Sequence, residues 1–411
     1  MPDAVRLTDL SEPTFSADVT AIFEVMGTMA EGLVLDSDQL HAMATEQTGL
    51  ADFGPRDYTE RLDVLLAAMR QVDGLTPGGL LNLHSQLLQL LKNRLRLVDL
   101  LAQHPEIAEA ELVPPLVIAG LPRTGTTHLH NLLSAGPTFR SLPYWESVEP
   151  FPTAEEGADI EPRRERTGQA TWFADEAMPY FKRMHEMTTD HVHEEIALLA
   201  NDFSTMFFET IAEVPAWRDH YLASDQTPHY AHLRLQLKAL QHLRGEPGQR
   251  WLLKSPQHLE QLPVLAEVFP GTTVVVTHRD PVAVTVSMAT MVAYTARMHR
   301  TPVPVERIGA YWADRIELML ATLVRDRDLL PGERSVDIRF ADFMADDLAT
   351  ARSVVELSGE PVTAEAEAAM QAYLDGHQRD RHGRIDYRAE DLGLDEDDLR
   401  RRFAAYTARF L

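Results

Sequence analysis

The stretch PPLVIAGLPRTGTTHLHNLLS, residues 114–134, decides the fold. Residues 116–119 form a short apolar run between a proline and a glycine, which predicts a buried parallel strand. Residues 120–125 form a turn with two glycines and a proline, and helical spacing of leucines begins after Thr126. A strand, a glycine loop and a helix in this order point free backbone N–H groups at an anion.

The loop nearly fits the P-loop pattern G-x-x-x-x-G-K-[ST]. Gly120 and Gly125 have the required spacing and Thr127 holds the hydroxyl position, but Thr126 replaces the lysine and Arg123 lies three places earlier. An NTPase uses its lysine on the β- and γ-phosphates and the hydroxyl on Mg²⁺. The loop therefore suits a nucleotide anion without a bound metal, and a tight turn closed by an N-capping threonine is the structural alternative.

A second stretch supports the anion site. Residues 272–277, TTVVVT, are strongly β-branched and predict a buried strand. HRDP at 278–281 follows, and then a helical segment begins. Arg279 stands at the carboxyl end of this strand, where α/β sheets bind ligands. Ser287 comes eight residues later, about two helical turns on, so both side chains are expected at one ligand.

Together, GLPRTGTTHL (120–129) and HRDPVAVTVS (278–287) resemble the two cofactor motifs of the sulfotransferase family, which uses 3′-phosphoadenosine-5′-phosphosulfate (PAPS). The resemblance is closest to the bacterial branch with arginine in the first loop. It implies an α/β, P-loop-like three-layer fold with a central parallel sheet. It also implies in-line transfer of a sulfuryl group from PAPS to a hydroxyl of a small-molecule or lipid-like acceptor, with no metal.

The resemblance also assigns cofactor contacts. Arg279 and Ser287 match the residues that hold the 3′-phosphate. The turn Arg381-His382-Gly383 loosely matches one that closes over that phosphate, and a solvated basic loop is the alternative. His128 takes the place of an aromatic residue that stacks on adenine, with an exposed helix-face histidine as the alternative. The residues expected to hold the 5′-phosphosulfate are Arg123, Thr124, Gly125, Thr126 and Thr127.

Charge grows on the leaving oxygen during transfer, and Arg123, Lys254 and backbone N–H groups of residues 125–127 are expected to stabilise it. Lys254 ends another short predicted strand, WLLKSP at 251–256. In the cytosolic animal members a lysine near this place is followed two residues later by the catalytic histidine. Pro256 stands at that position here, so the proton of the acceptor requires another base.

Glu146 is the first candidate for this base. It forms a Trp-Glu pair in an extended segment, and a glutamate at a similar distance after the loop serves as base in the tyrosyl-protein branch of the family. Trp145 can exclude water and raise the pKa of Glu146, whereas a helix cap or an arginine partner is the structural alternative. His185 and Glu195 follow, because both lie in the titratable segment MHEMTTDHVHEE, residues 184–195.

The same segment raises the question of a metal. His191 and Glu195 are four residues apart, and His185, His193 and Glu194 lie nearby. The pattern H-E-x-x-H is absent, and three histidines do not fall on one face of a helix. No metal site is therefore predicted, and the two glutamates are interpreted as favourable charge at a helix N-terminus or as a base or substrate contact.

Composition limits the class of protein. The chain has 411 residues, of which 45% are hydrophobic, enough for a large core. Cysteine is absent, which excludes disulfides, cysteine nucleophiles and thiolate metal sites. Apolar runs are too short to span a membrane, and the acidic N-terminus has no apolar signal region. These features predict a cytoplasmic protein, and the sequence leaves its oligomeric state open, a homodimer included.

The formal net charge is −25, which opposes binding to nucleic acid and to anionic membranes. PAPS would be repelled too, so its site must be a local positive pocket. Residues 1–110 are expected to be a helical region packed on a core of residues 111–411. Within it, Thr76-Pro77 is expected to start a helix through about Gln103, and Asp57 with Glu60 a capping pair.

Two other functions remain open. A P-loop kinase needs a loop lysine and an acidic residue for Mg²⁺ after a strand. Asp280 is placed for that role, but Arg279 beside it favours a 3′-phosphate. A non-catalytic nucleotide-binding or scaffold protein would keep the same motifs. Apolar residues at 172–187 and 203–217 could line an acceptor pocket or belong to the core, and the polar segment 153–168 is a surface loop or helix start that could serve as a lid.

Overall fold

A four-stranded parallel sheet lies at the centre of the protein. The computed structural model describes residues 4–245, 248–378 and 380–411. The strand order is β4 (Leu252–Lys254), β1 (Leu116–Gly120), β5 (Thr273–His278), β6 (Ser335–Arg339). The strands predicted from the apolar runs are confirmed, whereas β6 was not predicted. The carboxyl ends of β4, β1 and β5 meet at one edge, because Ile118 pairs with Lys254 and Gly120 pairs with Thr277.

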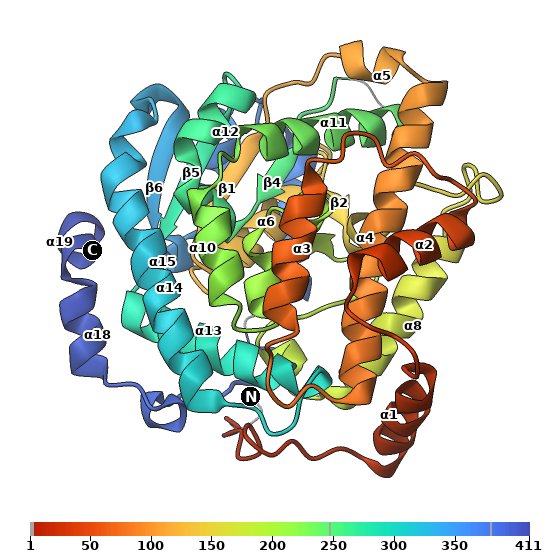
Figure 1. The fold of residues 1–411 in the computed structure, drawn as a ribbon. Coiled ribbons are helices and arrows are strands. Elements are labelled where there is room, and N and C mark those ends of the chain that lie inside the picture. Colours follow the sequence, from red (N-terminus) through yellow and green to blue (C-terminus); the bar gives the residue numbers. More distant parts are fainter. Residues whose placement is uncertain (1–3, 246–247, 379) are drawn as a thin grey trace.

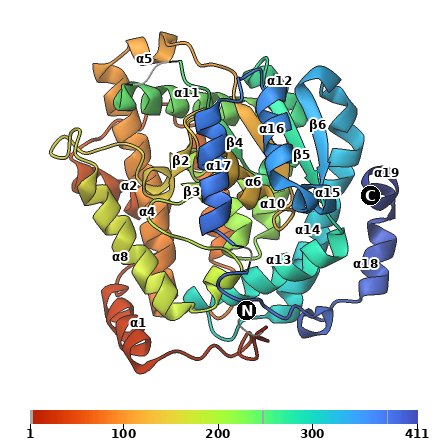
Figure 2. The ribbon, with the colours of Figure 1, turned by 180° about the vertical axis from the view of Figure 1, so that it is seen from behind.

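Helices cover both faces of the sheet (Figures 1 and 2). Successive side chains of a strand point to opposite faces. Leu116 and Ile118 accordingly join one apolar cluster, and Val117 and Ala119 join the other. The helices on the first face are α6 (Thr126–Ser134), α16 (Asp347–Leu357) and α17 (Ala364–Gly376), and those on the second include α11 (Thr227–Arg244), α12 (Leu262–Val268), α13 (Pro281–Thr295) and α14 (Val305–Asp326). The predicted three-layer α/β fold is therefore confirmed.

The N-terminal region is helical, as expected. Its helices are α1 (Ala17–Met29), α2 (Ser37–Thr48), α3 (Tyr58–Met69), α4 (Pro77–Gln103) and α5 (Glu106–Glu109). The hydroxyl of Thr76 caps α4 by accepting from the N–H of Gly79 at 3.0 Å. The capping pair of Asp57 and Glu60 is wrong, because the carboxylate of Asp57 makes no cap bond and pairs with Arg61 instead.

A second apolar cluster joins α2, α3 and α4 to η2 (Met206–Thr210) and α10 (Pro215–Ala223). At its border Arg94 of α4 donates to the buried carboxylate of Asp202 at 2.8 Å. The segment that follows α9 (Ile196–Ala200) is thus fixed against the N-terminal helices. The division of the chain at residue 110 stays a prediction.

The remaining elements are short or peripheral. The segment expected to be extended near Glu146 is extended only in β2, and a helix begins at Tyr144. β2 pairs with β3 in antiparallel fashion, with Leu142 opposite His193. These elements are β2 (Leu142–Pro143), α7 (Tyr144–Val148), α8 (Glu161–Ala177), η1 (Phe181–Arg183), β3 (Val192–His193), η3 (Pro256–Glu260), η4 (Ala296–Met298), η5 (Arg327–Leu329), η6 (Gly332–Arg334), α15 (Phe340–Ala345), η7 (Ala389–Leu392), α18 (Glu396–Arg402) and α19 (Ala404–Phe410). None of the helices in the described ranges has the length and apolar character needed to cross a membrane.

Candidate functional site

The loop between β1 and α6 has a backbone that few residues can adopt. A Cβ on Gly120 would lie 2.0 Å from Oγ1 of Thr277, so β5 approaches too closely for any side chain there. Arg123 has φ 71° and Gly125 has φ 90°, both in the left-handed region. For arginine this conformation costs about 1–2 kcal/mol. Backbone strain of this kind is concentrated at functional sites.

The two sequence motifs meet at Arg123. Its Nε donates to Oγ of Ser287 at 3.0 Å, and its guanidinium also donates to the carbonyl of Met184 and to the hydroxyl of Tyr387. Nη1 of Arg279 donates to the carbonyl of Arg123 at 2.6 Å. The structure therefore brings Arg123, Arg279 and Ser287 together, although the first lies 164 residues from the last.

Arg123 and Arg279 border a cavity of about 1340 Å³. Ser287 is buried behind Arg123 and is not among the described residues that line it. Its polar lining includes the start of α6 at Gly125, Thr126 and Thr127, where the first N–H groups of the helix have no intrahelical partner. Its apolar lining residues include Phe181, Met184, Ile196, Met206, Phe207, Ile211, Met288, Met291 and Val292. The cavity thus combines a cationic loop with an apolar wall.

Two cofactor residues expected from the loop differ in placement. The hydroxyl of Thr124 donates to the carbonyl of Leu121 at 2.6 Å and lies 2.6 Å from the hydroxyl of Thr277. Thr124 is buried, so its side chain closes the loop and does not face the cavity, contrary to the expectation. His128 does line the cavity, where its Nε2 lies 3.0 Å from a carboxylate oxygen of Asp347.

Lys254 reaches the loop from the end of β4. Its Nζ forms an ion pair with Glu194 and donates to Oγ1 of Thr127 at 3.4 Å. Its backbone N–H donates to Oε2 of Glu195 at 2.8 Å. Glu194 lines the cavity, whereas Glu195 is only 1% exposed. Glu195 is a candidate base from the sequence, but the side chain of Glu195 points into the core, whereas that of Glu194 faces the cavity.

The second oxygen of Glu195 bonds to Nε2 of His258, and Nδ1 of His258 lies 2.9 Å from the hydroxyl of Tyr230. Burial opposes ionisation of Glu195, but the hydrogen bond from His258 and the attraction to it outweigh burial and hold the pKa of Glu195 below its ordinary value. His258 is completely buried, so it cannot accept a proton from a molecule in the cavity. This network holds the backbone of Lys254 in place, and neither Glu195 nor His258 is among the described residues that line the cavity.

Glu146, the first candidate for the base, lies elsewhere. It is buried in α7, where Nε of Arg244 donates to its Oε1 at 3.1 Å and Nη2 of Arg244 to its other oxygen. It is not among the described residues that line the cavity. The arginine partner considered as the structural alternative is present, and this placement contradicts a role for Glu146 in accepting the acceptor's proton.

The C-terminal turn faces the histidine-rich segment. Arg381 and His382 both pair with the carboxylate of Glu186, at 2.5 Å and 3.1 Å, and Gly383 has φ 92°. All three turn residues line the cavity. The turn expected from the sequence therefore lies at the site, held by a carboxylate and not loose in solvent.

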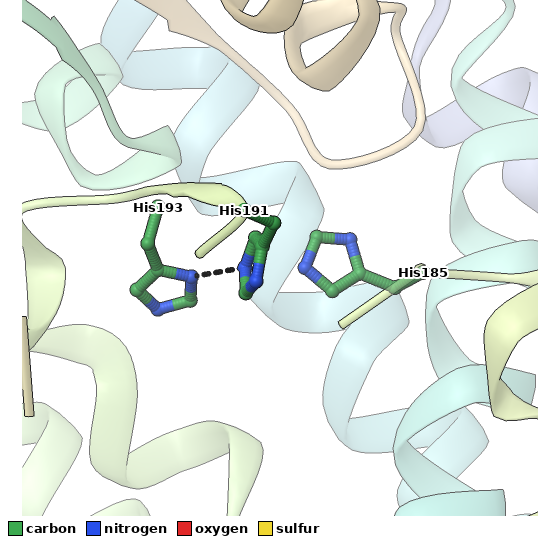
Figure 3. A group of neighbouring side chains, drawn as sticks. All are labelled: His185, His191 and His193. Carbon is green, nitrogen blue, oxygen red and sulfur yellow. Dashed lines mark hydrogen bonds between the residues drawn. The ribbon is translucent and has the colours of Figure 1, made fainter. Parts of the chain in front are cut away.

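Three histidines of residues 184–195 gather on the cavity wall (Figure 3). His185, His191 and His193 each place one ring nitrogen within 4.8 Å of the others. The segment is not helical before Ile196, so helical spacing does not determine whether these side chains meet. The sequence signal for this cluster was the alternation His-Val-His, which puts two side chains on the same side of an extended strand.

Comparison with known proteins agrees with this geometry. Residues 114–364 match the model of the sulfotransferase family. The sulfotransferase STF1 from Mycobacterium tuberculosis H37Rv is 30% identical, with a TM-score of 0.78 over 90% of this chain and 98% of that one. The sulfotransferase STF9 from Mycobacterium avium is 26% identical, with a TM-score of 0.81 over 92% and 97% of the two chains. Among curated proteins there was no match.

The buried network gives a prediction for stability. Glu195→Gln should lower the free energy of unfolding at neutral pH by about 1–3 kcal/mol, because a buried charged hydrogen bond is lost. The folded pKa of Glu195 lies below its ordinary 4.5, so its stabilisation is present above that pH and is lost as the pH falls through the folded pKa. Urea unfolding across this acid range should therefore show the difference from wild type shrinking.

The matched control is Glu396→Gln, at an exposed glutamate of α18, which should change stability by less than about 0.5 kcal/mol. A difference for Glu195→Gln that stays constant on acidification would contradict the assignment of a buried ionised carboxylate.

Proposed function

This chain belongs to the sulfotransferase family, and on that premise we propose that it transfers a sulfuryl group from PAPS to a hydroxyl of a small molecule with an apolar body. The observation that carries the proposal is the meeting of Arg123, Arg279 and Ser287 beside the start of α6. Cations and a helix N-terminus form a local anion site in a chain of net charge −25.

The cofactor contacts divide between the two motifs. Arg279 and Ser287 bind the 3′-phosphate: Oγ of Ser287 accepts from Arg123 and keeps its own proton to donate to a phosphate oxygen. Arg123 and the N–H groups of Gly125 to Thr127 bind the 5′-phosphosulfate. The proposed contacts are completed by His128, Arg381, His382 and Gly383.

The transition state follows from charge. Sulfuryl transfer, like phosphoryl transfer, is an in-line displacement in which charge grows on the leaving oxygen. Arg123 and Lys254 are fixed donors beside the loop, the first by Ser287 and the second by its links to Thr127 and Glu194. Preorganised donors of this kind need no rearrangement when the charge develops.

The proposed base is His185. It lines the cavity, and burial, with Lys254 next in effect, lowers its pKa well below the ordinary value, so that its imidazole is neutral. The acceptor oxygen forms a bond to sulfur as the bond from sulfur to the bridging phosphate oxygen breaks. The hydroxyl proton passes to His185, and the products are a sulfate ester and 3′-phosphoadenosine-5′-phosphate.

The acceptor site is the apolar wall. Phe181, Met184 and Met206 line the cavity, whereas Phe203, Phe208 and Trp217 from the same predicted ranges are completely buried in the core. Residues 172–187 and 203–217 therefore divide between the two roles considered from the sequence: some line the pocket, and others belong to the core. Several methionines in the lining favour an apolar acceptor of irregular shape.

No observation favours a kinase. Asp280, the residue available to a magnesium site, caps α13 by accepting from the N–H of Val282 at 3.0 Å. The high negative charge and the lack of cysteine support a cytoplasmic protein without a nucleic-acid partner. A homodimer stays an open prediction.

The first prediction concerns the 3′-phosphate. Arg279→Ala should weaken binding of 3′-phosphoadenosine-5′-phosphate by about 10- to 100-fold, since a charge-assisted hydrogen bond contributes about 1.5–3 kcal/mol. Binding of adenosine 5′-phosphosulfate, which lacks that phosphate, should change far less. Calorimetric titration of both ligands measures the ratio, with Arg402→Ala at the surface as control. Equal losses for the two ligands would refute the assignment.

The second prediction concerns Arg123. Arg123→Gly should lower kcat with PAPS by on the order of 100-fold, because one transition-state donor is lost. Glycine accepts φ 71° without strain, so stability should stay within about 1 kcal/mol of wild type. Kinetics with a responding acceptor and denaturant unfolding test both parts. Normal turnover by a folded variant would exclude Arg123 from the reaction.

The third prediction separates the candidate bases. His185→Ala should lose about 100-fold or more in kcat and the ascending limb of the pH profile, while PAPS affinity stays unchanged. That limb lies below the ordinary pKa of 6.5, because the proposed base must be unprotonated and its pKa is lowered. Glu146→Gln, which alters a buried ion pair outside the cavity, should keep the wild-type profile. The opposite result would return the role to Glu146.

A further inference from the structure

The three histidines of the cavity wall lie side by side, with His191 between His193 and His185 (Figure 3). Nε2 of His191 lies 3.0 Å from Nδ1 of His193, and the facing nitrogens of the group, with His185, are all within 4.8 Å. Two nitrogens bound tetrahedrally to zinc at about 2.0–2.1 Å are separated by about 3.4 Å. The pair of His191 and His193 is already close to that spacing.

Two backbone contacts hold the central ring. Nδ1 of His191 lies 2.5 Å from the carbonyl oxygen of Thr188 and 3.1 Å from the backbone nitrogen of the same residue, and Nε2 faces His193. In the tautomer in which Nδ1 donates to the carbonyl, Nε2 holds a lone pair. Metal-binding histidines commonly have their second ring nitrogen donating to a carbonyl in this way. The contact from Thr188 therefore orients His191 as a ligand before any ion arrives.

The ring nitrogens of the three histidines have few competing partners. No hydrogen bond among the described residues engages the ring nitrogens of His185, and on His193 only Nδ1 is engaged, by His191. Neutral imidazole is the form that coordinates metals.

We propose that His185, His191 and His193 bind one divalent transition metal, with zinc as the representative ion, and leave the fourth position open to the cavity. Three imidazoles with an open position suit Zn²⁺, and also Cu²⁺ and Ni²⁺. The ion takes the position between His191 and His193, and the single proton of the neutral His193 ring moves from Nδ1 to Nε2, so that Nδ1 can coordinate. The inference goes beyond the proposed function, because binding needs neither PAPS nor an acceptor.

Nearby charges set the strength of this site. Lys254 depresses the pKa of all three histidines and opposes a cation, as does Arg123 towards His185. Glu194 pairs with Lys254, and Glu186 favours positive charge at His191. The affinity is therefore lower than in a closed four-ligand structural zinc site. Coordination also takes the lone pair of His185 that the proposed base uses.

The test is a titration of the full-length, tag-free, chelator-treated protein with Co²⁺, followed by competition with Zn²⁺. Wild type should bind one equivalent at the cluster, with the intense visible absorption of cobalt in a low-symmetry nitrogen site. His191→Ala and His193→Gln should each weaken this binding by at least about 100-fold, since even partners beyond the ligands cost 10- to 100-fold. Thermal unfolding without metal establishes that each variant is folded.

The matched control is a second, exposed group, His104, Glu106 and His242, whose ligand atoms are equally close. His242→Ala should leave the visible absorption and the affinity unchanged. The proposal is overturned if wild type gives no cobalt absorption, if the absorption persists in folded His191→Ala, or if it is lost in His242→Ala. If His191→Ala does not fold, the same readings are taken from His193→Gln.

Discussion

Parallel pairing of β4, β1 and β5 is the constraint on which the site depends. It brings three carboxyl ends to one edge, so that Lys254, the loop after Gly120 and Arg279 leave the sheet side by side. The approach of β5 is close enough that Oγ1 of Thr277 excludes a side chain at Gly120. After the loop that follows Gly120, α6 begins at Thr126, and its N-terminus opens at the same edge.

Charge compensation explains how a chain of net charge −25 keeps cations at this edge. In the described structure, Lys254 is paired with Glu194 and Arg381 with Glu186. A guanidinium or ammonium that already has a carboxylate partner can exchange it for an anion of similar geometry without being left desolvated. In the proposed function an anionic ligand would replace these internal partners, and both carboxylates line the same cavity.

The sequence predicted those parts of the molecule that are set by short-range patterns. The apolar and β-branched runs correctly predicted β1 and β5. Both strands are buried on two faces, so nearly all of their residues are apolar or β-branched. β6 was missed because its burial is uneven at the sheet edge, with Asp337 and Arg339 exposed. Spacing within a motif likewise brought Arg279 and Ser287 to the same partner, Arg123.

These short-range patterns could not predict the direction in which individual side chains point. Glu194 and Glu195 are neighbours with opposite surroundings, and only the fold determines that the second points to His258. Thr124 is a hydroxyl residue like Thr126 and Thr127, but its side chain is buried because its hydroxyl contacts that of Thr277 on β5. Glu146 is bound by Arg244, which lies 98 residues away. Each of these errors comes from a partner that is distant in sequence.

Electrostatics also restricts which group in such a cavity can accept a proton beside an anionic donor. An unpaired carboxylate would repel the donor, and the two glutamates nearest the loop are already engaged, Glu194 by Lys254 and Glu195 by His258. A histidine kept neutral by burial adds no negative charge and still offers a lone pair. When it takes the proton it becomes cationic next to the sulfate being formed, so the same burial that weakens it as a base strengthens its attraction to the product.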